Sequence, residues 1–185
     1  GKFKELQAVL VPVMWGHRSG HANALHIYLP GSQTTWILLN LDSDLLDFKF
    51  WMAHELGHVL SVGLLEAGET DAAEDFADAF AGALLFPGAA ARKWLPAYQK
   101  AKSAPRRVSV LMDAAVEHVI SPLSVYKELE KHARSEDLPF EPLSSSFLHA
   151  EIAGLNKQLA TISEQMFDGE KPSADRYMRL ADERF

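Results

Sequence analysis

Residues 51–60, WMAHELGHVL, constrain the fold of this chain more than any other stretch. The segment is mostly apolar, but it contains His54, Glu55 and His58 and no lysine or arginine to offset the acid. On an α-helix, residues four apart lie on one face, so the two histidines point the same way. Burying imidazoles and a carboxylate without partners is costly, and a metal ion supplies such partners. We therefore predict a buried helix that carries a metal site.

The spacing His-Glu-x-x-His has a specific chemistry. Two imidazoles on one helical face bind zinc, and the intervening glutamate acts as general base on the attacking water. This interpretation makes His54 and His58 metal ligands and Glu55 the catalytic base. The alternative, a pair of core histidines satisfied by backbone groups, is weaker because the pattern rarely arises by chance in a chain of this composition. The chain has no cysteine, so any metal must be held by His, Asp or Glu.

A catalytic zinc ion needs a third protein ligand. The next predicted helix spans about residues 70–86 and must end there, because Pro and Gly follow. In it, Glu74 and Asp78 lie four residues apart on one face. Small Ala77 and Ala81 border that face and let the helix pack closely on the first one. Glu74 then fits as the ligand and Asp78 as the acceptor that orients an imidazole N–H. From spacing alone, a solvated Glu74 is nearly as good an interpretation.

The rest of the chain predicts one α+β domain with an appendage. With 185 residues and 48% hydrophobic content, it can bury one core. Runs rich in β-branched, aromatic and leucine residues predict strands at 9–14, 24–29 and 35–39, the last two forming a hairpin through a Pro-Gly turn. Apolar periodicity predicts helices at about 43–62, 70–86, 89–101, 108–118, 122–134 and 147–167. The predicted organisation is a zinc metallopeptidase domain over 1–138 (sheet about 9–40, helices about 43–134), a linker at 139–146 and a C-terminal helical extension over 147–185.

The last predicted helix has a narrow apolar stripe. Its apolar residues step by four and three, as in a coiled-coil heptad. They are Leu148, Ile152, Leu155, Leu159, Ile162 and Met166. Such a stripe must be covered, so we expect it either to pack back on the body of the protein or to pair with a second helix, as in a homodimer.

Charge and hydropathy restrict the partners. The net charge of −7 argues against a broad nucleic-acid surface, and the basic stretch 100–107 is better explained as a solvated helix end and turn. No run of about 18 apolar residues is present, so no membrane span is predicted. The absence of cysteine suits a cytoplasmic protein. We expect a protein partner and no direct binding to nucleic acid or membrane.

The remaining histidines are weaker candidates. His17 and His21 are four apart in GHRSGH, but the glycines favour a loop and no acid accompanies them. A hydrolase of this kind also needs a group that stabilises an oxyanion, and Tyr126 or a loop histidine fits that role without a basis for choosing. The other histidines are expected at the surface, namely His26, His118, His132 and His149.

Together the motifs resemble those of the ImmA/IrrE family of metallopeptidases. The resemblance rests on FWMAHELGHVL and on EDFADAFAGALLFP, which ends at Pro87. Phe76 and Phe86 stand where many family members carry Glu and Met, but neither is a predicted ligand. The site that the resemblance implies has His54, His58 and Glu74 as zinc ligands, Glu55 as catalytic base and Asp78 where the family has Asn or Asp.

The resemblance also implies a fold and a function. The fold is gluzincin-like, with a small antiparallel sheet packed on the active-site helix within a helical bundle. The function is cytoplasmic, zinc-dependent cleavage of a helix-turn-helix (XRE-type) repressor, which switches on stress-response genes. We expect the extended substrate to add as a strand at the edge formed by residues 35–39. Two alternatives remain: a metal-stabilised regulator that binds a repressor or antitoxin without cutting it, and a DNA-binding regulator with a structural metal, which the net charge disfavours.

Overall fold

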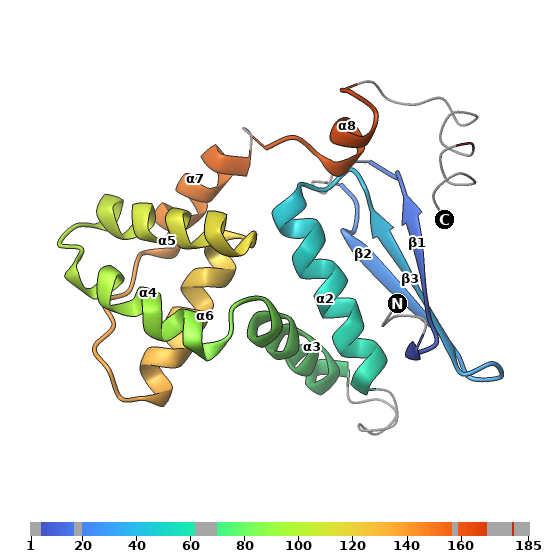
Figure 1. Cartoon of the computed structure of the whole chain (residues 1–185), viewed down its shortest axis with the longest axis horizontal. Helices are drawn as coiled ribbons and strands as arrows, with labels where there is room; N and C mark the ends of the chain where they lie inside the picture. The colour runs from blue at the N-terminus through green and yellow to red at the C-terminus, as the bar shows by residue number, and fades with distance from the viewer. Residues whose placement is uncertain (1–4, 17–19, 62–69, 157–158, 170–178, 180–185) are drawn as a thin grey trace.

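The computed structural model describes residues 5–16, 20–61, 70–156, 159–169 and 179 (Figure 1). Its elements are β1 (Ala8–Val13), β2 (Ala24–Leu29), β3 (Thr34–Asn40), α2 (Leu45–Ser61), α3 (Thr70–Leu85), α4 (Gly88–Lys100), α5 (Ala104–His118), α6 (Pro122–Ser135), α7 (Ser145–Asn156) and α8 (Ile162–Met166). The sheet lies to one side of α2, and α3 and the bundle α4–α7 lie to the other. The predicted α+β fold is confirmed.

The sheet is mixed, so the expectation of an entirely antiparallel sheet is wrong. Its strand order is β1-β3-β2, with β3 in the centre. The β2–β3 hairpin is antiparallel, as predicted, but β1 pairs with β3 in parallel, with Ala8 opposite Thr35. The buried residues Ile37 and Leu39 suit β3 to the central position. Pro12 suits β1 to an outer one, because proline lacks the N–H that a central strand donates on both sides.

Helix α2 is the buried element that its sequence predicts. The backbone N–H of Asp47 donates to the Asp44 carboxylate over 2.9 Å, so Asp44 caps the helix. Gly57 faces Ala77 of α3, which is fully buried, as is Ala81 one turn later. The small residues therefore allow the close approach of α3 to α2 that the sequence suggested.

The segment that follows α6 packs on the bundle. The Tyr98 hydroxyl donates to the Glu141 carbonyl over 3.0 Å, and the Phe140 and Tyr98 rings stack with centroids 4.9 Å apart. Buried Arg107 forms an ion pair with the Glu141 carboxylate. Residues 139–143 thus lie against α4 and α5, while the domain boundary placed there stays a prediction.

The prediction of a single C-terminal helix over 147–167 is wrong. The chain leaves the helical conformation at residues 159–161, and a separate helix, α8, begins at Ile162. Thr161 and Glu164 form a capping box, in which the Thr161 hydroxyl accepts from the Glu164 N–H and the Glu164 carboxylate accepts from the Thr161 N–H. This local cap overrides the heptad pattern. Leu148 and Ile152 of α7 are buried in the bundle core, whereas the Leu155 side chain lies outside the described residues. Pairing as a homodimer stays a prediction.

The start of helix α8 is hydrogen-bonded to the segment that follows β3. The N–H groups of Ile162 and Ser163 donate to the carbonyls of Ser43 and Leu41 over 2.9 and 2.7 Å. The Ser163 hydroxyl donates to one carboxylate oxygen of Asp42 over 2.7 Å. The other oxygen of Asp42 accepts from the Gly16 N–H over 2.9 Å. Asp42 therefore joins the C-terminal segment to the connection between β1 and β2.

No single helix among the described residues has the length and apolar character needed to cross a membrane. Helices α5 and α6 meet that test only when taken together, and they are bent by 105° relative to each other. Both contribute fully buried residues, such as Leu111 and Leu129, to the bundle core.

Candidate metal centre

Three predicted ligands come together where α2 meets α3. His54 Nε2 and His58 Nε2 are 3.1 Å apart, and each lies 3.3 Å from a carboxylate oxygen of Glu74. Two ligand atoms held about 2.0–2.1 Å from a tetrahedral zinc ion are separated by about 3.3 Å. The two nitrogens, and each nitrogen with its Glu74 oxygen (Oε2 for His54, Oε1 for His58), are therefore separated by distances close to those between ligands of one tetrahedral ion. The imidazoles are buried, whereas 59% of the Glu74 side chain is exposed, which leaves the centre open on the α3 side.

Asp78 contacts the Nδ1 side of the His54 ring. Its carboxylate lies 2.9 Å from His54 Nδ1, on the opposite side of the ring from the Nε2 that faces Glu74. Asp78 follows Glu74 by one helical turn, so both acids reach the same imidazole from α3. A carboxylate on Nδ1 fixes the orientation of the ring and raises the basicity of Nε2. The structure thus places Asp78 in the supporting position that the spacing suggested.

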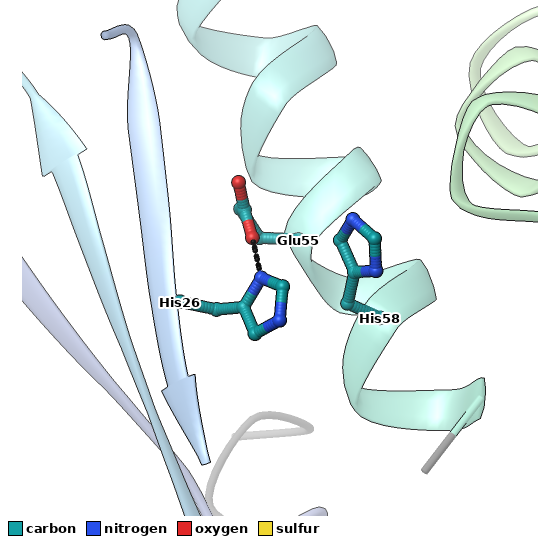
Figure 2. A group of neighbouring side chains, drawn as sticks. All are labelled: His26, Glu55 and His58. Atoms are coloured by element: carbon teal, nitrogen blue, oxygen red, sulfur yellow. Dashed lines mark hydrogen bonds and ion pairs between the residues drawn. The ribbon is translucent and has the colours of Figure 1, made fainter. Parts of the chain in front are cut away.

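Glu55 points away from α3 toward the sheet (Figure 2). Its carboxylate is buried and lies 2.7 Å from Nδ1 of His26, on β2. The hydrogen bond to Glu55 raises the pKa of His26 above its ordinary value of 6.5, against the opposing effect of burial. The His26 ring also stacks on His58, with centroids 4.3 Å apart and planes at 28°.

His26 is a residue of this region that the sequence analysis did not single out. It was expected at the surface, yet it is half-buried between β2 and α2. The alternation along β2 was misleading, because the strongly apolar residues Leu25 and Ile27 are the exposed ones. Ala24 and His26 occupy the more covered face instead. The alternation of side chains along the strand was the useful signal, because it places His26 on the opposite face of β2 from Leu25 and Ile27.

His58 belongs to two groups of potential ligands. His54, His58 and Glu74 form one, and His26, Glu55 and His58 form the other. In the second group, His26 and Glu55 are only 2.7 Å apart, which is a hydrogen-bond distance and too short for two ligands of one tetrahedral ion. The first group is therefore the better metal site. Burial, with a contribution from nearby His26, lowers the pKa of His58 and favours the neutral imidazole that binds metal.

A cavity of about 620 Å³ adjoins the centre between α2, α3, α6 and α7. Trp51 and Asp78 line it, and both contact His54: the Trp51 ring meets the imidazole edge-on at 4.9 Å. Its far wall includes Lys127 of α6 and His149 of α7. The cavity therefore lies on the Asp78 side of His54, away from the Nε2 atom that faces Glu74.

Two other expectations are corrected by the structure. Tyr126 lies in the bundle, where its hydroxyl accepts from the Leu143 N–H and its ring packs on Phe140, so it is not an oxyanion-stabilising group of this centre. Residues 35–39 lie in β3, which is paired on both sides and cannot accept a further strand. Within the described sheet, β2 is the outer strand that lies next to α2. His17 falls outside the described residues.

An α+β fold whose buried helix carries His-Glu-x-x-His, with an acid from the next helix completing a group able to hold a metal ion, defines a peptidase-type hydrolase. The chain belongs to the Peptidase_M78 family, described as the IrrE N-terminal-like domain, whose sequence model matches residues 13–119. That match covers the sheet from the end of β1, the candidate centre, and α4 and α5. No protein among those with curated descriptions matches the chain.

Proposed function

We propose that this peptidase depends on zinc, acts in the cytoplasm and cleaves a regulatory protein of the helix-turn-helix (XRE) repressor type. The zinc assignment is supported by one observation above all: His54 Nε2 and His58 Nε2 are 3.1 Å apart, and each lies 3.3 Å from a different carboxylate oxygen of Glu74. Two neutral imidazoles and one carboxylate are a common ligand set of hydrolytic zinc sites. The repressor assignment rests on the resemblance to the ImmA/IrrE family.

Each residue of the centre has a distinct task in this proposal. His54, His58 and Glu74 hold the ion, and Asp78 keeps the His54 ring in place. When bound, zinc promotes ionisation of the attacking water and polarises the scissile carbonyl. Glu55 takes the proton of the water and returns it to the leaving amine, which a neighbour of a ligand on the same helix can do without binding the metal.

The substrate is expected to bind along β2. This strand carries His26 next to Glu55, and its residues Leu25, Ile27 and Leu29 are exposed. An extended peptide that pairs with the outer edge of β2 would run past the catalytic base. The peptide backbone then supplies affinity through its hydrogen bonds to the strand.

The test is a cleavage assay read by mass. Purified protein with Zn²⁺ is incubated with a helix-turn-helix repressor encoded beside it, and Glu55→Gln protein serves as the matched control. The proposal requires two fragments whose masses add up to the substrate plus one water, formed by the wild type and not by the control. A stable complex without fragments would instead establish the non-cleaving regulator.

A further inference from the structure

The structure joins the outer strand to the active-site helix through one side chain. His26 Nδ1 lies 2.7 Å from Glu55 Oε2, and Figure 2 shows the imidazole placed between β2 and α2, directed at the carboxylate. The Glu55 side chain is only 5% exposed, whereas that of His26 is 35% exposed. His26 therefore covers a buried carboxylate from the solvent side.

The Glu55 carboxylate depends on this contact. A buried carboxylate needs hydrogen-bond donors, and an unpaired one is costly. Within the described part of the chain, no side chain other than His26 bonds it. The donor comes from a different element, so the bond fixes the carboxylate relative to the sheet as well as relative to its own helix.

His26 also contacts a ligand of the centre. Its ring stacks on His58 with centroids 4.3 Å apart, and His58 lies three residues after Glu55 on α2. One imidazole therefore touches both the base and a ligand. A hydrogen bond in the plane of the ring and a stacking contact on its face restrain two neighbouring side chains in different directions.

We propose that His26 is a positioning residue for Glu55: it donates from Nδ1 to one carboxylate oxygen and so directs the other oxygen toward the water that is activated. This inference rests on the proposed function, because it takes Glu55 as the base. General bases contribute about 10²–10⁴-fold only when they are within hydrogen-bond reach of the proton. Loss of the donor should therefore reduce turnover while leaving the base in the protein.

Two substitutions separate the hydrogen bond from the stacking. His26→Phe keeps a flat ring against His58 but removes the donor. His26→Asn loses the ring but keeps an amide N–H at nearly the position of Nδ1. We expect His26→Phe to lower kcat by about 10-fold or more, with KM and zinc content close to wild type. We expect His26→Asn to keep kcat within about threefold of wild type, a rescue that a space-filling role does not produce.

A second measurement needs neither zinc nor activity. The Tm of metal-free wild type, His26→Phe, Glu55→Leu and the double variant forms a double-mutant cycle, because leucine at position 55 removes the acceptor. If the bond exists, the loss of Tm in the double variant is smaller than the sum of the two single losses. Additive losses, or a His26→Phe protein with wild-type kcat, would overturn the inference. Should the wild type cleave nothing, the proposed function fails, and the metal-free cycle still decides whether His26 holds Glu55.

Discussion

Gly57 of α2 lies so close to Ala77 of α3 that a Cβ atom on Gly57 would come within 2.7 Å of the Ala77 Cα. This contact sets the separation of the two helices. Since α2 carries both histidines and α3 carries Glu74, the same contact sets the distance from the two histidine nitrogens to the Glu74 carboxylate. Backbone atoms cannot move aside as a flexible side chain can, so a larger residue at position 57 must shift α3.

Gly57→Ala should therefore damage both stability and metal binding. We expect a loss of about 1–3 kcal/mol in the free energy of unfolding, as for overpacked cores, and weaker zinc binding because Glu74 moves away. Gly154→Ala in α7 is the matched control, since its Cβ would meet nothing within 4 Å and alanine favours a helix by about 0.8–1 kcal/mol. Denaturant melts and zinc titrations measure both effects. Wild-type behaviour of Gly57→Ala would mean that the helix separation does not govern the centre.

Glu74→Ala should weaken zinc binding most among the exposed acids of α3. The wild type should hold about one zinc ion per chain, because three side chains and one open position complete the site. Loss of a residue that only hydrogen-bonds to a metal ligand typically lowers metal affinity by about 10–100-fold. Loss of a ligand itself should lower the affinity by at least as much. Asp75→Ala, at the adjacent exposed position, is the control. If Asp75→Ala loses the metal and Glu74→Ala keeps it, the third ligand has been misassigned.

Glu55→Gln should separate binding from chemistry. Glutamine keeps the size of the side chain but cannot accept a proton, so zinc content and Tm should stay close to wild type. Cleavage should fall by at least about 10²-fold. Mass spectrometry under native conditions gives the zinc content, and fragment formation gives the rate. Loss of zinc from this variant would show that Glu55 is itself a ligand.

Glu128 should make stability depend on pH. Burial raises the pKa of its carboxyl above the ordinary value of 4.5, although Lys131 and Lys127 act in the opposite direction. Because the folded state then holds the proton more tightly than the unfolded state, ionised Glu128 destabilises the fold, and the cost appears as pH rises from 4.5 through the folded pKa. Glu128→Gln should have a higher Tm than wild type near neutral pH, and the difference should vanish below pH 4.5.

Glu130→Gln is the control for this prediction. Glu130 lies on the same helix and is 38% exposed, and its carboxylate is 3.8 Å from Arg134. Exposed pairs contribute only about 0–1 kcal/mol, so this variant should show little change in Tm. If the Tm gain of Glu128→Gln grows as the pH falls, the sign of the linkage is wrong.

The approach of His54, His58, Glu74 and Asp78 to one another can be predicted from the sequence because the information is local. His54 and His58 share a helical face by spacing alone, and Glu74 and Asp78 repeat that spacing on the next helix. Small residues at Gly57 and Ala77 then bring the two faces together. None of these steps requires knowledge of the distant parts of the chain.

What the sequence does not predict depends on long-range contacts. The parallel pairing of β1 with β3 follows from competition among strands for the central position, which no single strand reveals. The break before Thr161 follows from a cap and from bonds to residues 41 and 43, which override a regular heptad. The role of His26 follows from the docking of β2 on α2, and its exposed apolar neighbours concealed it.

The bond from Ser163 to Asp42 joins residues that are 121 positions apart. Contacts of such high sequence separation form late, because the chain must lose the entropy of closing a long loop before the contact can stabilise the fold. During synthesis, which proceeds from the N-terminus, the sheet and α2 leave the ribosome long before Ser163 does. The part of the chain that carries His54 and His58 is therefore synthesised first, and a nascent chain that stops before Ser163 lacks the contact that ties its sheet to α8.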